Sequence, residues 1–199
     1  MKFLINPFWP ETHQRVNLGN KISPDDVDLI PDLELSPPSE LLDVTAKTKY
    51  TLVLSDPDAL SRKNPVKSQM CHWIVTNITL PDFISGNGHT LSLPSLLTSK
   101  SEEGIVQLKT YFPPAPPPKT GYHRYVFAFL KSNSDDPSLP KAPKERAHWG
   151  YGKVRAGIRE WAAENDLTVI GKFGPCDVPL VSANVFIAAN FFYAQNKKQ

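Results

Sequence analysis

Three polar clusters stand where apolar runs begin or end, and their side chains could bind a ligand together. Asp56 follows the run Tyr-Thr-Leu-Val-Leu-Ser, His72 opens the next apolar run, and His123 and Tyr125 open another. Loops on a rigid sheet commonly carry functional groups. A carboxylate beside imidazoles favours the protonated, cationic ring, so these residues predict a pocket for a phosphate monoester or a carboxylate.

Neighbouring residues are expected to shape this pocket. Phe112 and Pro117 would form an apolar wall. Pro57 fixes its own φ and restricts the residue before it, so the preceding carboxylate should be preset. Asp58 and Arg124 are each flanked by apolar residues. A carboxylate and a guanidinium carried toward the interior must pair to avoid a large desolvation cost, so we expect these two residues to be structural.

The same residues admit other interpretations. Taken singly, a histidine is more often structural than ligand-binding, and Asp-Pro at a strand end is usually only a turn. Two histidines and an aspartate could form a facial metal triad, which would need supporting groups that a sequence does not show. No Gly-x-Ser-x-Gly motif marks a serine hydrolase. We expect a protein that is not an enzyme, with no metal and no cofactor.

The elements that must position these residues are mainly strands, recognised as runs of apolar and β-branched residues that stop at Pro-rich loops. These strands are expected at about residues 50–55, 72–80, 105–112 and 122–130. Val154, Ile158, Trp161 and Ala162 share one helical face and predict a helix over about 152–164. We interpret 190–193 as a terminal strand. A mainly β domain with few helices follows.

Composition sets wider limits on the class of protein. A chain of 199 residues with 40% hydrophobic residues fits one domain over 1–199. Twenty prolines disfavour an all-helical bundle, and they break up 1–45, which we expect to be an irregular arm with at most short edge strands. The 22 basic and 20 acidic residues are interleaved, so we expect no extended positive field and no nucleic-acid partner.

The sequence also bears on the cellular location of the protein and on the redox state of its two cysteines. No apolar run approaches the length of a membrane span, and the first nine residues do not have the pattern of a signal peptide. A cytoplasmic location is therefore expected, with Cys71 and Cys176 reduced. Cys71, next to His72, is more often a buried inert thiol than an activated one.

Two segments of the sequence resemble signatures of the phosphatidylethanolamine-binding protein family. They are Asp-Pro-Asp-Ala-Leu-Ser-Arg at 56–62, followed by His72, and Gly-Tyr-His-Arg-Tyr-Val-Phe at 121–127. Trp-Gly-Tyr-Gly at 149–152 and Asn-Phe-Phe-Tyr-Ala at 190–194 resemble the fungal branch that contains the carboxypeptidase Y inhibitors. The resemblance implies a large central antiparallel β-sheet, a second smaller sheet and a few peripheral helices.

The resemblance also implies a site and a function. The implied pocket residues are Asp56, His72, His123 and Tyr125. The implied rim residues are Ala59, Pro117 and Phe112. The implied function is non-catalytic binding of phosphate-type anions or phospholipid headgroups, with regulation through signalling proteins and peripheral membrane contact at most. The alternative is inhibition of a serine carboxypeptidase. In that branch the N-terminal segment helps engage the protease; here it looks short, and 169–184 resembles an insertion.

Overall fold

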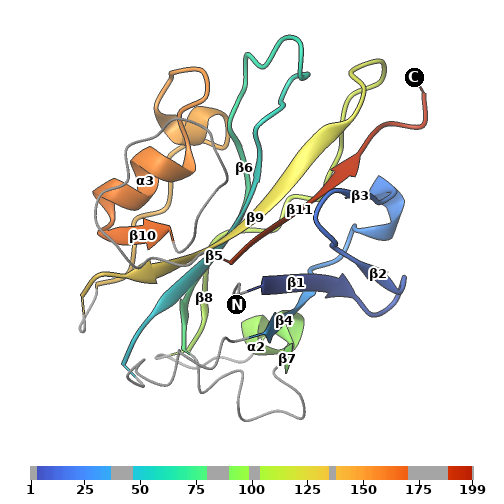
Figure 1. The fold of residues 1–199 in the computed structure, drawn as a ribbon. Helices are drawn as coiled ribbons and strands as arrows, with labels where there is room; N and C mark the ends of the chain where they lie inside the picture. Colours follow the sequence, from blue (N-terminus) through green and yellow to red (C-terminus); the bar gives the residue numbers. More distant parts are fainter. Residues whose placement is uncertain are drawn as a thin grey trace.

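Two β-sheets form the framework of the computed structural model in Figure 1. The parts of the chain that the structure describes are residues 4–36, 47–79, 90–98, 104–134, 138–169 and 188–198. The mainly β architecture with two sheets and few helices agrees with the expected fold class. None of the helices in these ranges is long and apolar enough to cross a membrane.

The large sheet has seven strands, in the order β3-β11-β9-β5-β6-β8 with β10 paired to β9. Its strands are β3 (Asn20–Lys21), β5 (Tyr50–Asp56), β6 (Met70–Ile78), β8 (Val106–Lys109), β9 (His123–Ser132), β10 (Leu167–Val169) and β11 (Ala188–Ala194). Neighbours are antiparallel, except that β11 and β3 are parallel. All seven residues of β5 are buried because both sheet faces are covered, which explains why its sequence does not alternate.

The small sheet corrects the expectation of an irregular N-terminal arm. Its order is β2-β1-β4-β7, and its strands are β1 (Leu4–Trp9), β2 (Gln14–Arg15), β4 (Asp32–Ser36) and β7 (Thr90–Leu91). Pro7 fits inside β1 because its carbonyl, which accepts the Val16 N–H at 3.0 Å, faces β2. The nitrogen of a strand residue faces the same side as its carbonyl, so Pro7 removes no donor from the pairing with β4.

Apolar side chains pack on both faces of the large sheet. One core fills the space between the two sheets and includes Trp9, Phe127 and Phe192. The second core lies under α3, where Trp149 and Trp161 pack together with ring centroids 5.4 Å apart. In Figure 1, α3 and the small sheet accordingly lie on opposite sides of the large sheet. The helical elements are α2 (Leu93–Thr98), α3 (Ile158–Glu164) and the 3-10 turns η1 (Pro24–Asp26) and η3 (His148–Gly150).

The helix α3 is shorter than the sequence pattern predicts, because it begins at Ile158 rather than near residue 152. Gly152 and Arg155 have φ of 65° and 70°, which a right-handed helix does not allow. The first turn is instead capped from outside, since the Ile158 N–H donates to Gln69 Oε1 at 3.2 Å. At Gly157 a Cβ would meet the Gln69 side chain within 2.4 Å, so this cap requires glycine.

The remaining expectations have mixed outcomes. The four core strands are confirmed, with bounds shifted by a few residues, and the terminal strand is confirmed as β11. Beyond Val169, the inferred insertion at 169–184 lies outside the described residues. That residues 1–199 form one domain stays a prediction.

Candidate functional site

Strand direction brings the predicted site residues to one end of the large sheet. β5 lies between β6 and β9 and is antiparallel to both. The last residues of β5 are therefore next to the first residues of its two neighbours: Asp56 pairs with Met70, and Ser55 pairs with Val126. Side chains far apart in the sequence meet there, as the three polar clusters predicted.

Asp56 and His123 form a buried pair at this end. The Nδ1 atom of His123 lies 2.8 Å from Asp56 Oδ2, and both side chains are at most 4% exposed. The other carboxylate oxygen, Oδ1, accepts the Asp58 N–H at 2.7 Å, the turn expected of Asp-Pro-Asp. Nε2 of His123 lies 2.9 Å from Thr120 Oγ1, which donates to the Pro117 carbonyl. Both ring nitrogens of His123 are thus engaged within the protein.

His72 differs from the expectation of a cationic ring. Burial lowers the pKa of His72 to about 4, outweighing the hydrogen bond to Phe112 and the charge of Asp56, which both raise it. Nδ1 lies 2.7 Å from the Phe112 carbonyl oxygen, so the neutral ring must carry its proton there. Nε2 makes no hydrogen bond within the described part of the chain. At neutral pH it is an acceptor.

Tyr125 lies between the two histidines. Its ring centroid is 5.2 Å from that of His72 in an edge-on arrangement and 6.5 Å from that of His123 in a stacked one. Burial, together with the charge of Asp56, raises the pKa of the Tyr125 hydroxyl, although a backbone hydrogen bond from Ala115 lowers it. The hydroxyl is therefore protonated at physiological pH.

Phe112, predicted to be part of an apolar wall, lies against His72. Its ring stacks on His72 with centroids 5.2 Å apart, remains 43% exposed, and is covered by the Arg146 guanidinium 5.3 Å away. Pro117 contributes through its carbonyl, the acceptor for Thr120. Ala59 is buried in the loop after β5, where its carbonyl accepts the Lys67 N–H at 2.9 Å. A role for Ala59 at the rim stays a prediction.

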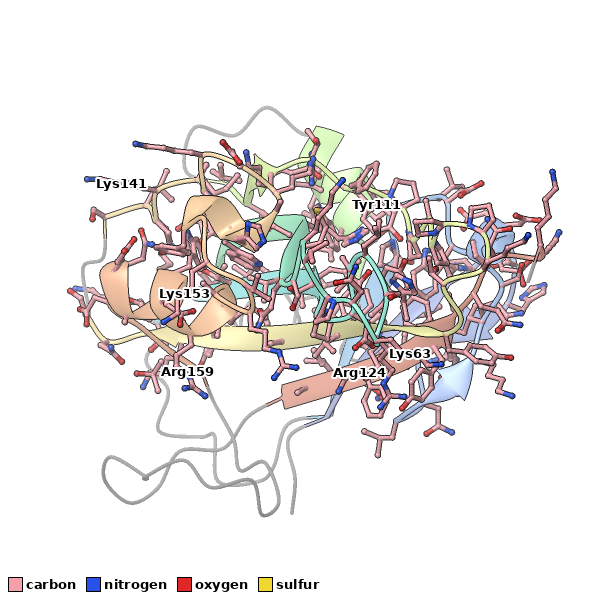
Figure 2. The ribbon with its side chains drawn as sticks, turned by 90° about the horizontal axis from the view of Figure 1, so that it is seen from above. Lys63, Tyr111, Arg124, Lys141, Lys153 and Arg159 are labelled. Carbon is pink, nitrogen blue, oxygen red and sulfur yellow. The ribbon has the colours of Figure 1, made fainter. Side chains whose placement is uncertain are left out.

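Asp58 and Arg124 form the expected pair beside the pocket. The Asp58 carboxylate, 3% exposed, accepts three hydrogen bonds of 2.7–2.9 Å from the Arg124 backbone N–H, Nε and Nη2. Burial alone would raise the pKa of Asp58, but these bonds and the guanidinium charge lower it below its ordinary value. These three hydrogen bonds fix the start of β9 to the loop after β5. Figure 2 labels Arg124.

Three residues of the site have no clear signal in the sequence. Thr120 binds His123 from the turn before β9. Phe192 of β11 stacks beneath Tyr125 with centroids 5.3 Å apart. Arg146 donates through Nη1 to the carbonyls of Cys71 and His72, and through Nη2 to Thr110. The threonine lies three residues before a motif histidine and Phe192 lies within the 190–194 segment, whereas Arg146 had no such signal.

The arrangement suits binding of a small polar group. It offers, at the end of a rigid sheet, a buried imidazole nitrogen with no hydrogen bond in the described ranges, a tyrosine hydroxyl and the half-exposed ring of Phe112. No group of three or more His, Cys, Asp or Glu side chains in the described ranges has the geometry of a metal site. Burial raises the pKa of the Cys71 thiol to about 12, as expected of an inert cysteine.

The fold and this site define a mainly β protein of two sheets with a buried polar cluster at one end of the large sheet. Comparison with known proteins gives its family. Residues 12–173 match the family model described as "Phosphatidylethanolamine-binding protein". The chain belongs to the phosphatidylethanolamine-binding protein family.

Individual relatives place the chain within that family. It is 32% identical to the carboxypeptidase Y inhibitor of Saccharomyces cerevisiae over 74% of this chain, a region spanning only 60% of the inhibitor. It is 30% identical to "Protein BROTHER of FT and TFL 1" of Arabidopsis thaliana, over 72% of this chain and 70% of that protein.

Solved structures agree with this placement. The carboxypeptidase Y inhibitor in complex with its cognate proteinase superposes with a TM-score of 0.70 at 25% identity, over 98% of this chain and 84% of the inhibitor chain. A phosphatidylethanolamine-binding protein from Plasmodium vivax gives a TM-score of 0.61 at 17% identity, over 97% and 85%, and shows the shared fold.

Proposed function

We propose that this chain is a non-catalytic module whose pocket binds phosphate-type anions, free or carried by a phospholipid headgroup, and that it acts as a regulator through partner proteins. The observation that carries the proposal is the convergence of Asp56, His72, His123 and Tyr125 at one end of the sheet, beside the exposed Phe112 ring. Their hydrogen bonds leave Nε2 of His72 open for a ligand.

Binding of an anion at His72 requires a proton. In the neutral ring Nδ1–H donates to Phe112, and Nε2 carries a lone pair that would repel an anionic oxygen. Protonation at Nε2 turns this atom into a donor and adds positive charge. The anion therefore raises the pKa of His72, and affinity increases as pH falls from the pKa of the complex toward about 4.

Calorimetric titration with inorganic phosphate and with acetate tests the proposal. Acetate stays singly charged above about pH 6, so a pH dependence in that range belongs to the protein. We expect both anions to bind more tightly at lower pH and His72→Gln to weaken binding at least about tenfold. His13→Asn is the matched control, because His13 lies in the turn between β1 and β2 and has a φ of 54° that asparagine tolerates. Equal affinity in both variants would contradict the proposal.

Inhibition of a serine carboxypeptidase is a second candidate function. It is supported by the 32% identity to the carboxypeptidase Y inhibitor and by the fold shared with that inhibitor in its proteinase complex. The test is titration of a serine carboxypeptidase with the full chain. Inhibition that saturates near one equivalent would support this candidate, whereas unchanged activity at micromolar concentration would remove it.

A further inference from the structure

A cavity beside α3 lies outside the site described above. Its volume is about 450 Å³, within the range of about 300–1,000 Å³ that is typical of small-molecule sites. Three segments line it: 141–144, 149–151 and the second half of α3. Its indole rings, Trp149 and Trp161, belong to the core under α3, whereas Tyr125 of the anion-binding pocket belongs to the core between the sheets. This cavity is therefore a separate candidate site.

Hydrogen bonds hold the three segments in place around the cavity. The Lys141 N–H donates to Asn165 Oδ1 at 2.7 Å, and the Lys141 carbonyl accepts the Trp161 Nε1–H at 2.8 Å. The Tyr151 hydroxyl donates to Glu164 Oε2 at 2.7 Å, which joins the remaining segment to α3. The cavity is therefore preformed, as small-molecule sites usually are.

The turn that carries Trp149 has an unusual backbone. His148, Trp149 and Gly150 have φ of 52°, 51° and 83°, so three successive residues are left-handed. This conformation is uncommon for residues other than glycine, and it clusters at functional sites. A Cβ at residue 150 would lie 3.2 Å from the Glu145 nitrogen, so glycine lets the segment before η3 pass close to the turn. The turn brings Trp149 and Tyr151 to the wall of one cavity.

The hydrogen-bond donors of the aromatic side chains are already used within the protein. Nε1 of Trp149 donates to Ser55 Oγ at 3.3 Å, and the Trp161 indole and the Tyr151 hydroxyl donate as described above. Aromatic grooves can bind Pro-rich peptides, but the buried carbonyls of a peptide need donors. A ligand that is apolar over most of its surface suits these walls better.

Two lysines supply the positive charge at the cavity. Lys141 and Lys144 are exposed, and neither forms an ion pair within the described part of the chain. Figure 2 labels Lys141, on the side of the molecule where α3 lies. Glu164 also lines the cavity, but one of its oxygens accepts the Tyr151 hydroxyl. Two positive side chains against one negative favour a ligand with a single negative charge.

We propose that the cavity beside α3 binds a small aromatic carboxylate. The ring of the ligand packs among Pro143, Tyr151 and the two indoles, and its carboxylate pairs with Lys141 and Lys144. None of these groups changes its charge near neutral pH, so this binding needs no proton. The proposal goes beyond the anion-binding pocket and uses other residues, so either site can fail without the other.

Calorimetric titration of the full chain with naphthoate and with its uncharged amide, naphthamide, tests the proposal. At about pH 8 the carboxylate is ionised and His72 is neutral. We expect naphthoate to bind about tenfold more tightly than naphthamide, because only the carboxylate pairs with the lysines. In Lys141→Gln with Lys144→Gln, the two ligands should bind equally. The matched control, Lys63→Gln with Lys67→Gln in the loop after β5, removes the same charge and should keep the preference.

NMR of the four tryptophan indoles locates the ligand. The Nε1–H signals of Trp149 and Trp161 should shift when naphthoate is added. Those of Trp9 and Trp73, in the core between the sheets, should stay constant. The four signals therefore contain their own control within one protein.

Filling the cavity gives a second test that leaves the charges in place. Ala142 is exposed and lines the cavity, so Ala142→Trp should abolish binding of both ligands. Ala163→Trp, at an exposed position of α3 outside the lining residues, is the matched control and should bind as wild type. Naphthoate affinity should also be constant between about pH 6 and pH 8, unlike binding at His72.

Several results would overturn the proposal. They are no binding of either ligand, a preference for naphthoate that survives loss of both lysines, and affinity that rises as pH falls. Shifts confined to Trp9 and Trp73, or tighter binding of a Pro-rich peptide than of naphthoate, would also overturn it.

Discussion

At the residue scale, burial has different consequences for Asp58 and His72. Asp58 is buried against a guanidinium that supplies charge and hydrogen bonds, so its pKa is lowered and it stays ionised. His72 has only a carbonyl and a more distant carboxylate to offset burial, so its pKa falls to about 4 and it stays neutral. The sequence predicted which groups meet, but ionisation depends on how many neighbours exclude water, and this emerges only from the packing.

The first prediction concerns stability at mildly acidic pH. The unfolded chain protonates His72 near pH 6.5, whereas the folded protein does so only near pH 4. Because the unfolded state binds more protons in this window, the free energy of unfolding should fall by about 3 kcal/mol between pH 6.5 and pH 4. Urea unfolding of wild type and His72→Gln measures this. The variant should have the flatter profile, and an equally steep one would refute the prediction.

The second prediction concerns the Asp58–Arg124 pair. Asp58→Asn should lower the free energy of unfolding by about 2 kcal/mol at pH 7, since it weakens three hydrogen bonds to a buried carboxylate. The pKa of Asp58 is lowered on folding, so this contribution is present above about pH 4 and is lost as pH falls further. Asp25→Asn is the control: it removes an exposed ion pair with Lys197 and should leave the free energy of unfolding nearly unchanged. Similar losses in both variants would count against the account.

At the element scale, segments from different parts of the chain fix the pocket wall. Arg146, from the segment before α3, joins β6 to the chain after β8 by donating to the Cys71, His72 and Thr110 carbonyls. The same guanidinium covers Phe112. A planar fork of donors can make these bonds together, and an ammonium group cannot.

The third prediction follows from this geometry. Arg146→Lys keeps the charge that acts on His72 but loses most of the fork, so phosphate affinity should fall about tenfold, or about 1.4 kcal/mol, with its pH dependence unchanged. Calorimetric titration over a pH series measures both quantities. Arg159→Lys, on the exposed face of α3, should bind as wild type. A shifted pH profile in Arg146→Lys would mean that charge, rather than positioning, is its contribution.

At the scale of the whole molecule, Asn190 joins the two sheets. From β11 its Nδ2 donates to the Ile5 carbonyl at 2.8 Å and to the Val16 carbonyl at 3.1 Å, while Oδ1 accepts the Leu18 N–H at 2.8 Å. These contacts span more than 170 positions of sequence. The side chain is 1% exposed, so water cannot replace it.

The fourth prediction tests this junction. Asn190→Leu leaves the Ile5 and Val16 carbonyls buried without this partner and also removes the acceptor of the part-buried Leu18 N–H, so it should lower the free energy of unfolding by about 3 kcal/mol. Denaturant unfolding measures the loss, and hydrogen exchange at the Leu18 amide should accelerate selectively. Asn64→Leu, at an exposed loop position, is the control. An unchanged exchange rate at Leu18 would show that the sheets are held by other contacts.

Features that depend on interactions between residues close in the sequence could be predicted, and features that depend on distant segments could not. The strand at 50–56 is a local apolar run, and one carboxylate oxygen of Asp56 is fixed by the Asp58 N–H two residues away, so both were predictable. The small sheet was not, because it pairs strands of two to six residues around Pro7. The start of α3 was not, because Gln69, which caps its first turn, comes next to Gly157 and Ile158 only after folding.

The most direct test of the anion-binding pocket is the pKa of the His72 imidazole, measured by NMR of ring-labelled protein with and without inorganic phosphate. Without phosphate the ring should titrate near pH 4, protonated on Nδ1 when neutral. Phosphate should raise that pKa by about two units or more, at least about a hundredfold coupling between proton and anion. An unchanged His72 pKa at saturating phosphate, in a protein that remains folded, would contradict the account.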